Sequence, residues 1–215
     1  MHKRKLELII AGIVILVTVA SIIFISAKNT REFVYEGEKG NIKFTTQQIG
    51  SVKFFMPHVF VDGREHIYNF RNKPHDLEDI PLEANLIYKL NRPGGIKDLF
   101  ITKDINLSDQ IGGKVSISIA PLLSILGRSD SGIYRVRITN TYTDHNPGDP
   151  IASVVDCSTV NLNTKINKTI AVIYLKLEDE NRIYSDGDCI VIEGKNTDGL
   201  IKSGEKFAYH LIGIF

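Results

Sequence analysis

The pattern of apolar residues divides the chain into two parts. Residues 8–27 form an almost uninterrupted apolar run of 20 residues, with no charge and no proline. A helix of that length rises about 30 Å, the thickness of a bilayer's hydrocarbon core. In lipid, only a helix satisfies all backbone groups within one segment. The run therefore predicts a single transmembrane helix, and the chain after it predicts a separate folded domain.

The flanks of this run indicate its orientation. Three basic residues precede it within residues 1–7, and two follow within residues 28–31. The excess of positive charge favours a cytoplasmic N-terminus. Residues 28–31 then form a short stalk, and residues 32–215 form one extracytoplasmic domain. The alternative is a cleaved signal peptide, whose apolar core is normally about 7–15 residues long; because this run is longer, we favour an uncleaved signal anchor in the cell membrane.

Most of the outer domain shows the patterning of β-strands. Residues 33–35 and 42–44 flank a turn-rich connection, which predicts a hairpin. Residues 52–61 and 64–70 flank Asp62-Gly63, a dipeptide typical of the type I′ turn that joins two strands. Further strands are predicted at residues 86–90, 99–102, 134–139, 169–177 and 189–192.

Two segments have helical spacing instead. Residues 119–126 repeat their apolar side chains helically, with Pro121 tolerated only in the first turn. A stronger helix is predicted over residues 200–212, with a cap at Asn196 or Thr197 and Gly213 just beyond its end. Its opposite face is expected to be solvated and carries Lys202, Glu205, Lys206 and His210. The predicted fold class is a sheet-dominated α+β (mixed α/β) domain, with this C-terminal amphipathic helix packed on the sheet.

Charge excludes one class of partner. The 215-residue chain has a formal net charge of +1. Three basic residues and Glu7 give residues 1–7 a charge of +2, which leaves −1 for residues 8–215. A domain that binds nucleic acid through phosphate attraction is usually strongly basic, so we expect no nucleic acid as a partner.

The two cysteines, Cys157 and Cys189, belong to the predicted outer domain. An oxidising compartment permits a disulfide between them. The alternative is two separate buried thiols, which behave as small apolar side chains. A zinc site or a thioredoxin-type redox site is not supported, because there is no CxxC motif and no histidine lies near the cysteines in sequence.

Two polar segments are candidates for chemistry. His75, Asp76 and Asp79 lie in the polar stretch 71–83 and offer groups for acid–base catalysis. The alternative is an exposed connection with a helical turn after Pro74, and we favour that interpretation.

The second segment, residues 143–150, contains the weak metal candidates Asp144, His145 and Asp149, and the oxygens of Asp144, Asn146 and Asp149 resemble the opening of a calcium loop. It lacks the remainder of that pattern, and its Asn, Asp, Gly and Pro residues are typical of any tight loop. We therefore expect a loop here and no metal.

No nucleotide-binding, serine-hydrolase or HExxH motif occurs in the chain. We therefore expect no cofactor and a binding or structural module of the cell envelope rather than an enzyme. The expected partners are the lipid bilayer, through residues 8–27, and another envelope or membrane protein. Two alternatives remain: a membrane-anchored hydrolase that uses carboxylates and histidine with a divalent cation, and an accessory subunit of a membrane complex.

Overall fold

The computed structural model describes residue 15 and residues 31–91, 95–105, 107, 114–149, 151–158 and 169–215. Within these residues, no helix is both long and apolar enough to cross a membrane. Apart from Ile15, the apolar run 8–27 lies outside them, as do residues 1–7 and 28–30. The transmembrane helix therefore stays a prediction.

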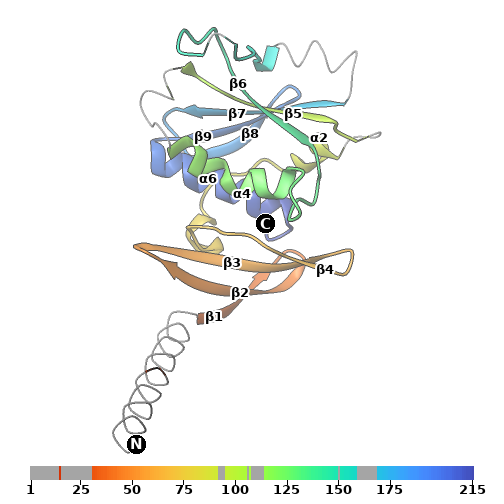
Figure 1. Cartoon of the computed structure of the whole chain (residues 1–215), viewed down its shortest axis with the longest axis vertical. Coiled ribbons are helices and arrows are strands. Elements are labelled where there is room, and N and C mark those ends of the chain that lie inside the picture. Colours follow the sequence, from red (N-terminus) through yellow and green to blue (C-terminus); the bar gives the residue numbers. More distant parts are fainter. Residues whose placement is uncertain are drawn as a thin grey trace, which may run out of the picture.

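The N-terminal part of the described chain is a four-stranded antiparallel sheet in the order β1-β2-β3-β4 (Figure 1). Its strands are β1 (Arg31–Gly37), β2 (Gly40–Ile49), β3 (Val52–Val61) and β4 (Arg64–Ile67). Both predicted hairpins are confirmed. Asp62 and Gly63 have φ values of 50° and 76°, as the turn between β3 and β4 requires.

The second sheet has five strands in the order β6-β5-β7-β9-β8. They are β5 (Asp98–Lys103), β6 (Arg137–Tyr142), β7 (Ile170–Leu177), β8 (Arg182–Asp186) and β9 (Cys189–Gly194). Neighbouring strands run parallel except for β8, which is antiparallel to β9. Every residue of β9 is buried, as expected for a parallel strand that is covered on both faces.

Two predicted strands differ from the structure, and one observed strand was not predicted. The strand predicted at residues 86–90 is wrong, because Ile87–Leu90 form the short helix α2. Leu86 and Leu90, both buried, are spaced by one helical turn, and this spacing was mistaken for part of a strand. The strand predicted at 134–139 begins later, at Arg137, and β8 was not predicted.

The helices agree better with the sequence. Helix α6 spans Thr197–Leu211, with the Asn196 Oδ1 accepting the Gly199 N–H at 2.8 Å, so its predicted cap is confirmed. Helix α4 spans Lys114–Leu126, which places Pro121 in its interior. The expectation that Pro121 lies in the first turn was wrong, because the helix begins before residue 119.

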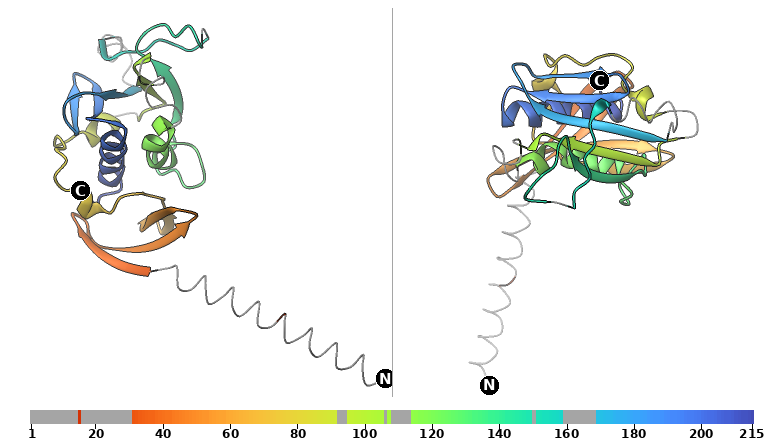
Figure 2. Two further views of the ribbon diagram at one scale, coloured as in Figure 1. Left: turned by 90° about the vertical axis from the view of Figure 1, so that its left-hand side faces the viewer. Right: turned by 90° about the horizontal axis from the view of Figure 1, so that it is seen from above.

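The elements form three layers, with α4 and α6 side by side between the two sheets (Figures 1 and 2). The helices approach each other closely at Gly204, where a Cβ would lie 2.4 Å from the Ser118 carbonyl oxygen. Helix α6 packs on the five-stranded sheet as predicted. The expectation that its opposite face is solvated was wrong: Glu205 and Lys206 are only 1% and 6% exposed, because the chain that follows the four-stranded sheet, residues 71–78, and Phe215 cover them.

Glu205 joins these layers. Its carboxylate accepts the backbone N–H of Arg71 at 2.6 Å, and from Asn72 both the backbone N–H at 2.9 Å and the side-chain amide at 2.7 Å. Burial raises the pKa of Glu205 although these donors oppose the shift. The hydroxyl of Tyr209 donates to the Asn72 carbonyl, and its ring stacks on Phe70. The chain leaving the four-stranded sheet is therefore fixed to α6 by polar and aromatic contacts.

Candidate functional site

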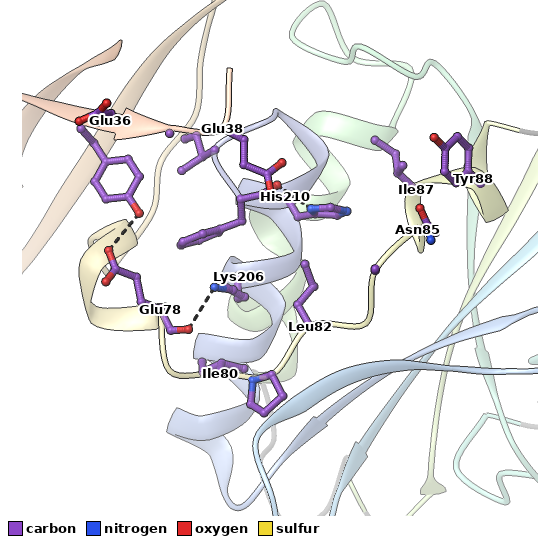
Figure 3. Close-up of a pocket in the computed structure, with 16 residues that line it drawn as sticks. Glu36, Glu38, Glu78, Ile80, Leu82, Asn85, Ile87, Tyr88, Lys206 and His210 are labelled. Atoms are coloured by element: carbon purple, nitrogen blue, oxygen red, sulfur yellow. Dashed lines mark hydrogen bonds between the residues drawn. The ribbon is translucent and has the colours of Figure 1, made fainter. Parts of the chain in front are cut away.

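A groove of about 750 Å³ lies where β1, α6 and residues 78–88 meet. This volume is in the range of small-molecule sites. Figure 3 shows α6 behind the groove, with residues 78–88 crossing in front of it and the end of β1 above. Apolar side chains from these segments and the C-terminal residues line part of it: Ile80, Leu82, Ile87 and Ile214. The lining also includes three glutamates, Lys206, His210 and Asn85, which makes the site amphipathic.

Backbone pairing holds the wall formed by residues 78–88 in place. The Ile183 N–H in β8 donates to the Pro81 carbonyl, and the Glu83 N–H donates to the Ile183 carbonyl, each at 2.9 Å. The Glu83 carboxylate also accepts the N–H and the hydroxyl of Ser185, both at 2.6 Å. Because β8 is the last strand of its sheet, these bonds both cover a sheet edge and position the groove.

Lys206 is the most unusual residue in the lining. Its Nζ donates to the Glu78 carbonyl oxygen at 3.4 Å and lies 3.4 Å from the centre of the Phe215 ring. Burial lowers the pKa of Lys206, and nearby carboxylates, led by Glu78, oppose the shift. An ammonium group has three N–H donors. One long hydrogen bond and a cation–π contact leave this buried charge with donors that a ligand can use.

Glu78, on the other side of the groove from His210, makes several polar contacts (Figure 3). Its Oε1 accepts the hydroxyl of Tyr35 at 3.0 Å and lies 3.1 Å from Nδ1 of His75. Hydrogen bonds from His75 and then Tyr35 lower the pKa of Glu78. Burial, followed by the bond to Glu78, raises the pKa of Tyr35 to about 12. Glu78 is therefore an ionised carboxylate at neutral pH, and it lines the groove together with Glu36 and Glu38.

His210 lies one turn after Lys206 on α6. Its Nδ1 is 2.7 Å from the main-chain oxygen of Phe215; because that oxygen can only accept, Nδ1 carries a proton. Its Nε2 is buried, and no described residue forms a hydrogen bond with it. In the neutral ring, Nε2 is an acceptor. Lys206 and His210 thus line the groove together from α6 at i, i+4 spacing (Figure 3).

The carboxyl ends of the parallel strands are a second place to seek a ligand site in an open sheet of this kind. Asp104, just after β5, accepts the hydroxyl of Thr143 at 2.9 Å and that of Tyr174 at 2.6 Å, both on its Oδ1. These bonds tie together the ends of β5, β6 and β7. The polar groups here are hydrogen-bonded to one another and stabilise the sheet, whereas those of the groove are incompletely paired.

The first predicted candidate segment lies beside the groove. Pro74–Leu77 form the short 3-10 helix η1, as the alternative interpretation of a helical turn predicts. The His75 side chain is 81% exposed and contacts Glu78, while the Asp76 carboxylate accepts the Lys73 N–H. Asp79 lines a separate surface depression with Lys195 and Lys202. Only His75 therefore contributes to the groove, and it does so through Glu78.

The second candidate segment lies elsewhere, in an exposed loop after β6. The Asp144 carboxylate accepts the backbone N–H of His145, and Asn146 accepts that of Gly148, which are bonds typical of turns. Figures 1 and 2 show this segment on the far side of the five-stranded sheet from η1. Neither Asp144, His145 and Asp149 nor any other set of three His, Cys, Asp or Glu residues in the described chain could hold a metal ion.

Cys157 and Cys189 form a disulfide, with their Cα atoms 5.5 Å apart. Cys189 begins β9, and the bond holds the chain around Cys157 against the face of the five-stranded sheet that the helices leave open. Val155 and Val172 pack in the same small apolar cluster. The disulfide thus helps to cover the second face of the five-stranded sheet. Neither cysteine lines the groove.

Lys206, His210 and Glu78 were missed as site residues. The first two were recognised on one face of the C-terminal helix, and their i, i+4 spacing was visible in the sequence. We predicted that both are exposed to solvent, because no local pattern in the sequence shows that other parts of the chain pack on this face of the helix. Glu78 was grouped with its acidic neighbours, and nothing in the sequence distinguishes it from Asp76 or Asp79.

No protein-family model matches the chain, and no curated protein matches it. A search of solved structures finds a likeness to metalloproteinase-II from Bacteroides fragilis, with 10% sequence identity over 84% of this chain and 74% of that one. The TM-score is 0.26, too low to establish a common fold. This likeness carries no argument about the fold or the activity.

Proposed function

We propose that this chain is a membrane-anchored binding module of the cell envelope, and that its ligand site is the groove beside Lys206. Residues 8–27 anchor it, with residues 1–7 in the cytoplasm and the domain outside. The apolar run and its basic flank support the anchor. The Cys157–Cys189 disulfide supports an extracytoplasmic domain, because such bonds persist in oxidising compartments.

The observation that carries the proposal is the incompletely paired ammonium of Lys206 beside a groove of ligand size. A buried charge is costly unless it is paired. The fold places Lys206 there with one long hydrogen bond, so an acceptor group on a ligand gains a charge-assisted hydrogen bond in a shielded site. We assign to Lys206 the role of binding a carboxylate or another acceptor.

The other polar groups define the rest of the ligand. Glu38 and Glu78 line the groove and act on the Lys206 ammonium, and Glu36 lies at the rim of the same groove, so a ligand with only negative charge is repelled. A zwitterion satisfies both charges, with its carboxylate on Lys206 and its ammonium on the glutamates. Its apolar part lies on the isoleucine and leucine side chains. The ligand class that fits is an apolar amino acid or the end of a peptide.

A binding titration tests this assignment. The probe is 4-fluorophenylalanine, followed by ¹⁹F NMR in the presence of the full chain in nanodiscs. Replacing Lys206 by Met removes the buried charge and keeps much of the side-chain volume. We expect Kd to rise at least about tenfold, because a hydrogen bond to a charged group contributes about 1.5–3 kcal/mol.

Two controls separate this effect from others. Lys202→Met, on the same helix and outside the groove, should leave Kd unchanged. N-acetyl-4-fluorophenylalanine lacks the ammonium and should bind more weakly than the free amino acid. No binding to the wild-type chain, or equal binding to the Lys206 and Lys202 variants, would contradict the proposal.

A further inference from the structure

One face of the four-stranded sheet has no partner among the described residues. Side chains alternate along β1 and β3, so that Phe33 and Phe55 pack into the core while Val34 and Phe60 point away from it. The register places Val34 opposite Lys43, and Phe60 opposite Glu65. We call this surface the outer face. Its apolar members are Val34, Ile49, Phe54, Met56, Phe60 and Ile67.

The outer face is unusually apolar for a surface. Val34, Ile49, Phe60 and Ile67 are 64%, 54%, 69% and 45% exposed. Elsewhere in residues 31–215, the large apolar side chains that the structure describes as exposed are Tyr88, Ile151 and Val154. An apolar surface concentrated on one face of one sheet indicates an interaction surface.

Several polar groups on this face are paired with one another. Lys43 and Glu32 form an ion pair at 2.8 Å. His58 lies between Thr45 Oγ1 at 2.6 Å and Glu65 Oε1 at 2.7 Å. This order of hydroxyl, imidazole and carboxylate resembles a catalytic relay, but Thr45 lies in a strand paired on both sides, so its backbone offers no free N–H to an oxyanion. Glu36, paired in register with Asn41, lies exposed on the same face, so this face carries more acidic than basic residues.

The position of the apolar run 8–27 identifies the partner. The run ends at Ala27 and β1 begins at Arg31, so the chain between them spans at most about 14 Å. A domain on so short a connection stays at the membrane surface. We infer that the outer face of the β1–β4 sheet lies against the lipid bilayer, with Val34, Phe60 and Ile67 at the boundary between headgroups and acyl chains.

This inference rests on the anchor of the proposed function but not on the ligand site. The partner is a bilayer rather than a protein because the anchor brings the face to lipid without a further binding step. Because acidic residues outnumber basic ones on this face, it suits uncharged or zwitterionic headgroups rather than anionic ones. Ile151 is 92% exposed and shortly precedes Val154, which bridges to Tyr142 at the end of β6 in the five-stranded sheet, so it is remote from the sheet that carries the outer face.

Spin labels measure this arrangement directly. Single cysteines replace Val34, Phe60 or Ile151 in the full chain, in which Cys157 and Cys189 remain bonded, and each is labelled in phosphatidylcholine nanodiscs. Power saturation with oxygen and with a water-soluble nickel complex reports the depth of each label. We expect labels at 34 and 60 to collide with the nickel complex at least about threefold less often than the label at 151, and to favour oxygen.

Three other outcomes would overturn the inference. Equal nickel accessibility at 60 and 151 would show that the outer face is in water. The proposed membrane anchor and the proposed ligand site would not be affected by that result. Spin–spin broadening at 34 and 60 without preference for oxygen would identify a second copy of the chain as the partner. Release of the protein from vesicles by alkaline carbonate would show that residues 8–27 do not anchor it, and then both this inference and the anchor fail.

Discussion

The five-stranded sheet is covered on both faces, by α4 and α6 on one side and by the disulfide-linked chain around Cys157 on the other. Within the part of the chain that the structure describes, the four-stranded sheet is covered on one face only. Its inner side chains, such as Phe44 and Phe55, are as buried as those of the larger sheet, whereas Val34 and Phe60 are exposed. The five-stranded sheet therefore forms the centre of the core, whereas the four-stranded sheet presents one face as a surface. The groove lies where the end of β1 in the four-stranded sheet approaches α6.

Matched truncations of isoleucine test this difference most strongly. Ile173 in β7 is fully buried and Ile67 in β4 is 45% exposed. We expect Ile173→Ala to lower the free energy of unfolding by about 4 kcal/mol, because it leaves a cavity in a close-packed core. Ile67→Ala should lower it by less than about 1 kcal/mol. Chemical denaturation of both variants measures this, and equal losses would contradict the distinction between the sheets.

Removal of the disulfide tests the cover of the larger sheet. The bond closes a chain segment with a sequence separation of 32. Cys157→Ser with Cys189→Ser should lower the free energy of unfolding by about 3 kcal/mol, mainly because the unfolded chain gains entropy. Kd for 4-fluorophenylalanine should not change, because the disulfide does not line the groove. Denaturation curves with and without reductant, on wild type and variant, check the loss of stability, and the ¹⁹F NMR titration checks Kd.

The sequence predicts those parts of this structure that local interactions determine. Asp62-Gly63 predicts its hairpin because the turn needs positive φ at both residues, and Asn196 predicts the start of α6 because its side chain caps the first turn. The apolar stripe of α6 likewise predicts that it packs on a sheet. Each of these signals lies within a few residues of the feature that it specifies.

The groove has no such local signal. Tyr35, Glu78 and Lys206 come from segments separated by more than 40 and more than 120 positions, and they meet only because the four-stranded sheet folds against α6. A lysine on the polar face of an amphipathic helix predicts exposure when that helix is considered alone. Its burial depends on tertiary packing, which the pattern of a single sequence does not contain.

The smallest expected effect concerns the stability contributed by Lys206 at high pH. Burial lowers its pKa, so between the lowered value and the ordinary 10.5 the unfolded chain binds more protons than the folded chain. The free energy of unfolding of the wild type should therefore rise with pH in that window, relative to Lys206→Met. Denaturation of both proteins between neutral and alkaline pH checks the sign, and parallel curves would contradict it.

The account depends most on the claim that the fold buries a lysine without fully pairing it. NMR titration of the lysine side chains in isotopically labelled full chain, with Lys206→Met to assign the signal, measures this directly. We predict that Lys206 titrates below the ordinary lysine value of 10.5 and that saturation with 4-fluorophenylalanine raises its pKa. A pKa at or above 10.5 in the free protein would show that Lys206 is already solvated or paired, and would contradict the account.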